Sequence, residues 1–508
     1  MTEPAVSEEL VNGAPDSARM VGRSEGSVGD RAEVPRTSTF SRRLLQICAA
    51  SFALRLSYVL LVTKSAPLAG DALYYSAQGQ AIAAGRGFAH PFYFAGTMPA
   101  ADHPPLAAIV MALGPLIVGS KSMVFGMPLF VFVQRLTLVL IGTATVAVVG
   151  ATARRTMSVP ASGELDRDQE SISGRAAQRD AGPVADRVGL LAACFAAVSP
   201  SLWVNDGILM SESVAALALA AVLWVALVAW GRPGIRQWAM LGGAIGLAAL
   251  ARAESVSLLA VLAAPMVLLR HRGSARKILF SGVSAAIACL LVCATWLIPN
   301  AIRFEERALF STSDGLLWLG ANCPDTYSGD WRGFWTLGCL RHFDTDGNGR
   351  NDEEDLHSWS PFDRATEDQS QISRRYQAAA FQFIGGHKRA FVKLSVVRVA
   401  RTWGIWRPDQ MAEYNRGEGR SLAVSWMAWA DHIIMMPLAA VGLVALRRAG
   451  RPTWPFVAQG IAVTLISALV YGLARFRLGW DVAACILAAI GVDRSLRRFS
   501  TRVGASRE

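Results

Sequence analysis

Residues 278–299 read ILFSGVSAAIACLLVCATWLIP, an apolar run without a single charged side chain. A run of roughly 17–25 such residues matches the hydrocarbon core of a bilayer, where the backbone can satisfy its polar groups only as a helix. Similar runs, almost free of charge, occupy 127–151 and 457–473. These stretches predict membrane-spanning helices, and the chain is expected to be an all-α polytopic membrane protein.

The charge of the chain is distributed as expected for a membrane protein. The 508 residues are 52% hydrophobic, and 50 Lys and Arg against 39 Asp and Glu give a net charge of +11. The basic residues stand in short clusters at the ends of apolar runs, which is typical of orientation signals rather than of a nucleic-acid surface. We therefore expect a membrane partner and no nucleic acid.

The basic clusters also predict the topology. Those at 42–43, 153–187, 270–277, 447–451 and 494–498 are all expected in the cytoplasm. An even number of crossings must then separate each neighbouring pair. The apolar run 104–119, broken by Gly114-Pro115, violates this parity and is predicted to lie at the outer membrane surface instead. About ten spans remain, at 44–62, 127–151, 188–204, 212–230, 238–252, 255–270, 278–299, 424–446, 455–473 and 478–492.

This topology divides the chain into segments. Both ends lie inside, in a multi-pass protein of the plasma membrane, and two long segments lie outside. The predicted parts are a disordered cytoplasmic tail (1–40), an N-terminal transmembrane module (41–299) with an outer loop (63–126), an extracytoplasmic loop domain (300–423), C-terminal transmembrane helices (424–492) and a cytoplasmic tail (493–508).

The first outer loop carries residues suited to chemistry at the membrane surface. Asp71 follows the first span, and Tyr74 and Tyr75 stand one helical turn later. A helix-capping role for Asp71 is equally compatible, because Asp is a good N-cap and Tyr favours the interface. Pro104-Pro105 gives the following apolar helix a rigid entry, and His103 before them is either structural or part of the pocket.

An ordered set of motifs resembles a known family. The motifs are Asp71-x-x-Tyr74-Tyr75, Ala84–Phe88 (AGRGF), His103-Pro104-Pro105, Leu209–Glu212 (LMSE), Gly246–Arg252 (GLAALAR) and Tyr471–Arg477 (YGLARFR). In this order they resemble the GT-C glycosyltransferases of the protein O-mannosyltransferase and aminoarabinose-transferase type (glycosyltransferase family 39-like). The resemblance covers most of 44–492 and implies a GT-C-like fold.

The resemblance implies roles for individual residues. Asp71 matches the family's catalytic base, and Glu212 matches a second acid at the outer end of a later span. The mannosyltransferases often carry an Asp-Glu pair where this chain has Asp71-Ala72, so a protein acceptor does not follow. Glu212 is open to three interpretations: orienting the acceptor, assisting a divalent metal in the active site, or a first-turn acid favoured by the helix dipole.

The donor implied by the resemblance is a polyprenyl-phosphate sugar. Its phosphate needs cations, and Arg is the favoured bidentate partner. The candidates are Arg252, Arg475 and Arg477, all predicted near the outer face, with Arg55 a weaker one inside the first span. Snorkelling to the headgroups is the alternative for each. A carboxylate such as Asp71 can take the proton of the acceptor hydroxyl, which implies inversion at the anomeric carbon.

The second outer segment predicts two stabilising features. Cys323 and Cys339 are expected to pair in an oxidising compartment. The acidic stretch 344–355 matches the calcium-loop template with oxygen donors at the prescribed spacing, and a solvated acidic turn is the alternative. The expected structural Ca²⁺ ligands are Asp344, Asp346, Asn348, Arg350, Asp352 and Asp355. A basic, Trp-bearing amphipathic stretch at 387–408 is expected to form a helix on the outer membrane surface, as a contact to donor lipid or as an anchor.

The resemblance, together with the residues that carry it, therefore implies an inverting glycosyltransferase of the cell envelope, a hexosyl- or pentosyltransferase. It would move a sugar from a polyprenyl-phosphate carrier to a hydroxyl of a glycan, lipid or protein on the extracytoplasmic face. A transporter or lipid-linked-glycan flippase is the chief alternative, although no internal repeat typical of transporters is evident. A catalytically inactive scaffold is a third.

Overall fold

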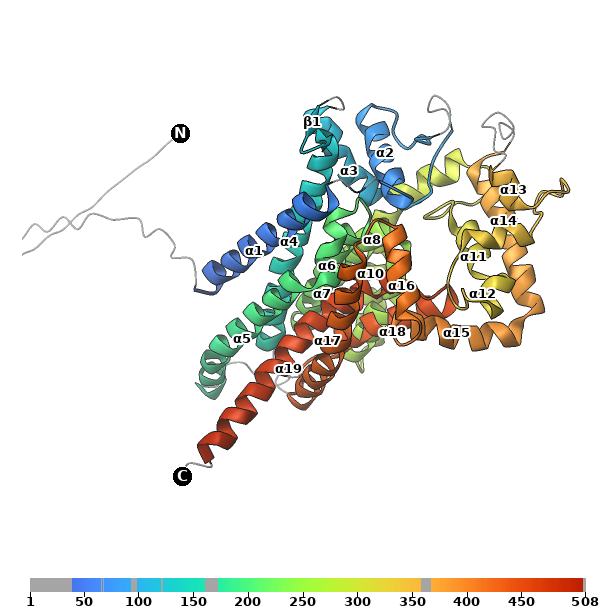
Figure 1. Ribbon diagram of the computed structural model, residues 1–508. Coiled ribbons are helices and arrows are strands. Elements are labelled where there is room, and N and C mark those ends of the chain that lie inside the picture. The colour runs from blue at the N-terminus through green and yellow to red at the C-terminus, as the bar shows by residue number, and fades with distance from the viewer. Residues whose placement is uncertain are drawn as a thin grey trace, which may run out of the picture. The chain divides into compact units, whose positions relative to one another are not determined.

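The computed structural model describes residues 39–64, 66, 68–92, 98–119, 122–159, 172–357 and 367–505. The chain divides into the units Met1–Ser38 and Thr39–Glu508, and the first lies outside the described residues together with nearly all of the predicted tail. The second unit is almost entirely helical (Figure 1), with one antiparallel pair of two-residue strands, β1 (Met123–Val124) and β2 (Met127–Pro128). The predicted all-α class is confirmed.

Six helical segments are long and apolar enough to cross a membrane, and a bent pair makes a seventh among the described residues. The protein is thus a multi-pass membrane protein. The bent pair joins Gly182–Val198 to Pro200–Gly207 at 57°. The six are α1 with its π-helical turn η1 (Thr39–Thr63), α4 (Leu129–Ser158), α7 (Glu212–Gly231), η4 through α9 (Ala253–Arg270), α10 (Ala275–Arg303) and α17 (Leu422–Arg448).

The remaining three predicted spans are helical too, but they do not reach the same length and apolarity. α8 (Ile235–Ala251) has 17 residues and α18 (Trp454–Leu469) has 16, so each is about 25 Å long at 1.5 Å per residue. The third lies in the first half of α19 (Leu478–Ala505). The count of ten crossings accordingly stays a prediction for these three helices.

Close glycine contacts join the helices in pairs, as is common between helices in membranes. α8 packs on α10 so tightly that a Cβ on Gly242 would lie 1.9 Å from the carbonyl oxygen of Ala285. α17 approaches α19 in the same way, with a Cβ on Gly442 falling 1.9 Å from the carbonyl oxygen of Leu487. Any side chain at either glycine would push two backbones apart.

The helix expected at the membrane surface is α3 (Pro105–Val118), with 14 residues. It packs against α2 (Asp71–Ala83), α4 and α8. Its exposed apolar side chains are Ile109, Leu113, Leu116 and Ile117. A helix of this length is shorter than a bilayer core, in keeping with its exclusion from the spans.

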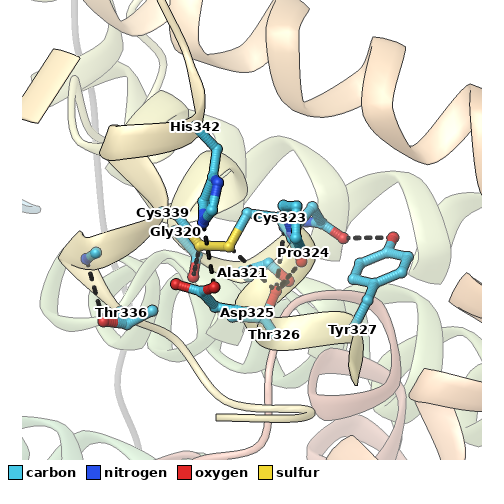
Figure 2. Close-up of a disulfide and its surroundings, with 12 residues drawn as sticks. Gly320, Ala321, Cys323, Pro324, Asp325, Thr326, Tyr327, Thr336, Cys339 and His342 are labelled. Carbon is cyan, nitrogen blue, oxygen red and sulfur yellow. Dashed lines mark hydrogen bonds and ion pairs between the residues drawn. A yellow bond between two sulfur atoms is a disulfide. The ribbon is translucent and has the colours of Figure 1, made fainter. Parts of the chain in front are cut away.

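The long segment between α10 and α17 folds into short helices beside the transmembrane ones (Figure 1). They are α11 (Asp314–Ala321), α12 (Pro324–Ser328), the 3₁₀ helix η6 (Leu337–His342), α13 (Asp352–His357), α14 (Gln369–Gly386), α15 (Lys388–Thr402) and α16 (Pro408–Gly417). A disulfide joins Cys323, just before α12, to Cys339 in η6 (Figure 2). This is the pair expected from the sequence.

The expectation of a lipid-contacting surface at 387–408 is wrong for two of its arginines. Arg398 and Arg401 of α15 are 0% and 1% exposed. Arg398 donates to the carbonyl oxygen of Ala321 (2.7 Å), and Arg401 donates to the side chain of Gln410 (2.8 Å). Both guanidinium groups satisfy backbone and side-chain oxygens of the outer segment, so they hold that segment together instead of facing lipid.

Candidate active site

A cavity of about 490 Å³ opens where eight stretches of chain meet. They are the start of α2, the residues before α3, the residues before α7, the α8–η4 junction, the start of α11, the start of η6, the end of α16, and the 3₁₀ helix η7 (Ala474–Arg477). Each comes from a different part of the sequence, and most are ends of helices. The cavity contains most of the predicted site residues, namely Asp71, Tyr74, Tyr75, His103, Arg252 and Arg475.

Asp71 is the first residue of α2 and points toward two cationic groups. Its carboxylate lies 3.2 Å from Nη1 of Arg475 and 3.5 Å from Nε2 of His103. Gly70 occupies the N-cap position, with φ +53°, so the capping role considered for Asp71 is not the one it takes. Its side chain remains 33% accessible, which a base that must meet a substrate requires.

The electrostatics of this corner keep Asp71 ionised. Burial alone would raise the pKa of its carboxyl, but His103 and then Arg475 outweigh this effect and hold the pKa well below its usual range. Burial alone would lower the pKa of His103, and the Asp71 carboxylate raises it above its ordinary value instead. A carboxylate base is therefore available at any physiological pH.

A series of ion pairs with alternating sign runs from Asp71 to Glu254. Nη1 of Arg475 contacts Asp71 (3.2 Å) and also Oε1 of Glu418 (3.3 Å), and Glu418 in turn pairs with Arg420. Arg420 lies 3.8 Å from Glu212, whose Oε1 accepts from Nη1 of Arg252 at 3.2 Å. Nε of Arg252 donates to Glu254 at 2.6 Å. Arg475 and Arg252 are thus fixed at the cavity wall by carboxylates on either side.

Glu212 does not line this cavity. Its side chain is 3% accessible and lies behind Arg252, at the start of α7. Its Oε2 has no hydrogen-bond partner among the described residues. This placement corrects the expectation that Glu212 faces substrate: it contacts the cavity only through Arg252.

Arg477 and Arg55 also lie away from the cavity. Arg477 is directed to the other side of η7, where Nε donates to Asp481 (3.0 Å) and Nη1 to the carbonyl oxygen of Thr402 (3.1 Å). Arg55 is buried in α1 and pairs with Asp206. Neither arginine makes the predicted phosphate contact, since each is in an internal ion pair instead. For Arg477 the cause is the 3₁₀ turn η7, which directs Arg475 and Arg477 to different neighbours.

Aromatic rings form the wall beside the base. His103 stacks on Tyr75 with ring centroids 4.9 Å apart and meets Tyr74 edge-on at 5.2 Å. Tyr414, Tyr471 and Trp335 line the same cavity. Such surfaces suit a sugar ring, which presents C–H groups as well as hydroxyls, and a rigid ring stack holds His103 against Asp71.

Several cavity residues were not predicted from the sequence. Glu418 and Tyr414 come from the end of α16, and Asp314 begins α11. Burial and the nearby Glu254 raise the pKa of Asp314 to about 6. These residues lie in the long outer segment, where no apolar period indicated which side chains face inward. The two arginines that line the cavity, Arg252 and Arg475, share one local sequence feature, a preceding alanine (Ala251 and Ala474).

The predicted calcium loop lies apart from the cavity. Oδ1 of Asp344 accepts from the backbone N–H of Gly347 (2.8 Å), and Oδ2 accepts from that of Gly349 (3.0 Å). The Asn348 amide donates to both Asp346 (3.1 Å) and Asp355 (3.0 Å), so these two carboxylates converge on one point. Arg350 lies within the same turn.

Asp352 completes the donor set of this loop. Its Oδ1 accepts from Thr345, and Oδ2 is buried with no hydrogen-bond partner among the described residues. No three carboxylates of the described loop lie within 4.8 Å of one another. The carboxylate, amide and carbonyl oxygens of the loop are ligand types that Ca²⁺ takes. Because the carboxylates are not yet close together, the loop would have to contract to bind the ion.

One other grouping of ligand types lies near the disulfide. Cys323, Asp325 and His342 have ligand atoms within 4.8 Å of one another, the single such group found among the described residues. Figure 2 shows His342 directed at Asp325, which it contacts at 3.1 Å, and the Cys323 sulfur bonded to Cys339. Because the sulfur is in a disulfide and Asp325 also pairs with Arg341 (2.7 Å), we assign no metal to this group.

Comparison with known proteins gives distant structural neighbours. No family model and no curated protein matches the chain. A crystal structure of ArnT from Cupriavidus metallidurans bound to undecaprenyl phosphate is similar at 16% identity and a TM-score of 0.37, over 90% of this chain and 78% of that one. The crystal structure of the apo form of the same protein is similar at 16% identity and a TM-score of 0.34, over 89% of this chain and 78% of that one. Both are of the aminoarabinose-transferase type that the ordered motifs resemble.

Proposed function

We propose that this protein is an inverting glycosyltransferase that uses a polyprenyl-phosphate sugar as donor and an extracytoplasmic hydroxyl as acceptor. The observation that carries the proposal is the corner where an accessible Asp71 carboxylate meets Arg475 at 3.2 Å. A base and a phosphate-binding cation then stand side by side at a cavity of about 490 Å³. Arg252 provides a second cation on the same wall.

The chemistry needs only these groups. The acceptor oxygen forms a bond to the anomeric carbon while the bond from that carbon to the phosphate oxygen breaks. The acceptor proton passes to the Asp71 carboxylate, and the electron pair leaves with the polyprenyl phosphate, whose charge the two guanidinium groups stabilise. Direct displacement from the face opposite the phosphate inverts the anomeric configuration.

In this proposal Glu212 is a positioning residue. Its carboxylate holds Nη1 of Arg252 at 3.2 Å from behind the cavity wall. A divalent metal at this point does not fit the residues present, since both Arg252 and Arg420 already surround the carboxylate and would repel a dication. No step of the reaction is routed through a metal.

The position of the ion-pair series does not favour a transporter. The ion-pair series lies at helix ends and in the loops between them, and its members are Asp71, Glu212, Arg252, Glu254, Glu418, Arg420 and Arg475. A transporter is expected to bind its substrate near the bilayer midplane, between broken helices.

The direct test is sugar transfer from defined polyprenyl-phosphate donors by the purified full-length protein. Asp71→Asn is expected to lower kcat about 10²-fold to 10⁴-fold, the usual contribution of a general base. The matched acid control is Asp409→Asn, whose carboxylate is exposed and pairs with Arg407. Full activity of Asp71→Asn would overturn the base assignment. A wild-type protein that transfers from none of the donors but moves one across proteoliposomes would favour the transporter.

Glu212→Gln separates positioning from chemistry in the same assay. It is expected to raise the donor KM more than it lowers kcat, because it loosens Arg252 without touching the base. An unchanged KM with a kcat loss as large as that of Asp71→Asn would assign Glu212 a direct role instead.

We also propose that 344–355 binds a structural Ca²⁺ through Asp344, Asp346, Asn348, the Arg350 carbonyl, Asp352 and Asp355. The support is the convergence of Asp346 and Asp355 on one amide and the buried, unpartnered Oδ2 of Asp352. A ligand that binds the folded state stabilises it by about 2.7 kcal/mol at a concentration of about 100 times its Kd. Excess Ca²⁺ is therefore expected to raise the Tm of this protein. Asp344→Asn should abolish this shift, and Glu354→Gln, an exposed acid of the same segment, should keep it. A Tm unaffected by Ca²⁺ would favour a solvated acidic turn.

A further inference from the structure

A second large cavity lies at the opposite ends of the helices from the active-site cavity. It has a volume of about 590 Å³ and is bounded by the ends of α4 and α17, by α5 (Ile172–Val198), and by α19. Its charged lining consists of five arginines and a single acid: Arg448, Arg451, Arg494, Arg497, Arg498 and Asp493. We call this the basic groove.

Part of this charge is used inside the protein. Asp493 is 6% exposed and is held by Nε of Arg497 at 2.9 Å and Nε of Arg187 at 2.5 Å. Arg451 donates to the carbonyl oxygens of Thr156 (2.9 Å) and Val159 (3.1 Å), which closes the end of α4. The one acid of the groove is thus already neutralised by two guanidinium groups.

Arg448 and Arg494 are in a different situation. Both are exposed, and no ion pair joins either to a carboxylate within the described part of the chain. They come from two packed helices, α17 and α19, so the groove presents positive charge from both walls. Like charges placed together favour an anion between them.

The wall of the groove next to these arginines is apolar. Val441 and Val444 on α17 are 44% and 48% exposed, and Ala440, Ala445 and Ile490 line the cavity with them. An apolar surface that leads up to a cationic rim has the polarity of a phospholipid, with acyl chains below a phosphate. A soluble anion would use the rim and leave the valines uncovered.

We propose that the basic groove is a binding site for an anionic phospholipid of the surrounding membrane. Arg448 and Arg494 contact the headgroup phosphate, and an acyl chain lies along Val441 and Val444. By the positive-inside rule these helix ends face the cytoplasm, so the lipid belongs to the inner leaflet. The lipid would clamp α17 to α19, two helices whose other ends carry the linker with Glu418 and the turn with Arg475.

The test uses the full-length protein in detergent and dioleoyl-phosphatidylglycerol as probe, with dioleoyl-phosphatidylcholine as the neutral counterpart, followed by native mass spectrometry. The wild type is expected to retain phosphatidylglycerol preferentially. Near a membrane each Arg contributes about 1 kcal/mol, so the double variant Arg448→Gln/Arg494→Gln should bind about 30-fold more weakly.

Arg447→Gln provides the matched control, because Arg447 is exposed on the same turn of α17 and does not line the groove. It should bind like the wild type, and circular dichroism melting of each variant reports its folding. Inorganic phosphate at the same concentration should not displace the lipid. Equal retention of both lipids, equal loss in the Arg447 variant, or displacement by phosphate alone would each overturn the proposal.

Discussion

At the scale of single residues, Arg475 is the central cation of the candidate active site, because it contacts two carboxylates at once. Its Nη1 lies 3.2 Å from Asp71 and 3.3 Å from Glu418. In the proposed reaction, a donor phosphate that binds Arg475 would compete with Asp71 for the guanidinium and free the carboxylate to meet the acceptor. Glu418 keeps the arginine in place during this exchange.

This sharing predicts different outcomes for two arginines of the same turn. Arg475→Lys keeps the charge but loses the planar guanidinium, whose Nη1 contacts both carboxylates and whose other nitrogens can bind a phosphate bidentately, so the donor KM should rise about tenfold or more. Arg477→Lys should leave the donor KM near the wild-type value, since Arg477 pairs with Asp481 away from the cavity. Steady-state kinetics with varied donor measures both. Equal effects in the two variants would contradict the assignment of Arg475.

Asp314 predicts a pH dependence of donor binding. Burial raises its pKa to about 6, so Asp314 is neutral at pH 5 and carries a negative charge in the cavity at pH 7. The phosphodiester of the proposed donor is anionic at both pH values. For an assumed separation of about 8 Å and an effective dielectric of about 20, its repulsion from Asp314 is about 2 kcal/mol before screening. The donor KM should therefore rise about three- to tenfold from pH 5 to 7.

Asp314→Asn should flatten this rise, and Asp409→Asn should retain it. His103 faces Asp314 as well, but its raised pKa keeps it protonated over most of this window. Asp71 does not contribute, since its pKa lies well below the window. An unchanged pH profile of KM in the Asp314 variant would show that another group titrates.

The residues of the site were partly predictable. Asp71, Tyr74, Tyr75 and His103 lie in one short loop and are marked by their motif, so the sequence pointed to them. Arg475 and Arg477 could not be told apart, because their separation depends on a 3₁₀ turn that has no sequence signature here. Glu418 could not be predicted at all, since its role arises from a contact 57 positions away in the chain.

At the scale of elements, the disulfide supports the wall that contains Trp335. Cys323 precedes α12 and Cys339 lies in η6, so the closed loop includes Trp335 between them. The indole packs on Gly320, where a Cβ would lie 2.4 Å from Nε1. The bridge therefore restrains a cavity residue and does more than link two helices.

Removing the bridge is expected to affect stability and donor binding together. Cys323→Ala/Cys339→Ala opens a loop with a sequence separation of 16, and a loop of about 15 residues corresponds to about 3 kcal/mol. The free energy of unfolding should fall by about that amount, and the donor KM should rise. Cys194→Ala removes a thiol that is not bridged and should change neither. A double variant as stable as the wild type would mean that the bridge is not formed in the native protein.

The helices themselves were predictable to different degrees. Long apolar runs predicted α4, α7, α10 and α17, because a single apolar segment that spans the bilayer satisfies its backbone hydrogen bonds only as a helix. Apart from α15, which falls in the stretch 387–408 predicted as a helix, the short helices of the outer segment were not predicted, since no apolar period marks them and tertiary contacts such as those of Arg398 and Arg401 stabilise the segment. The same contacts explain why Arg398 and Arg401 of the stretch 387–408 face inward. Val392 and Val396 of α15 are 68% and 70% exposed, so the position of this helix at the membrane surface stays a prediction.

At the scale of the whole molecule, charge parity and the cavity agree on the same topology. Ten crossings place 63–126, 205–211, 253–254, 300–423 and 474–477 on one side, and the cavity is lined by residues from each of these stretches. The basic groove is lined by residues that parity places on the other side. If α8 or α18 failed to cross, one of the cavity's walls would be on the wrong side of the membrane.

The crossing of α8 can be tested directly with single cysteines in a background without Cys194, the exposed free cysteine. Ten crossings place Ser274, between α9 and α10, inside, and Ser328, at the end of α12, outside. In intact cells Ser328→Cys should react with a membrane-impermeant maleimide, and Ser274→Cys should react only after the membrane is opened. With 17 residues, α8 reaches about 25 Å against a hydrocarbon core of about 30 Å. Local thinning of the bilayer or snorkelling of the flanking residues makes up such a difference. Labelling of Ser274→Cys in intact cells would contradict the ten-crossing topology, and if α8 is the helix that does not cross, Arg252 could not share a face of the membrane with Asp71.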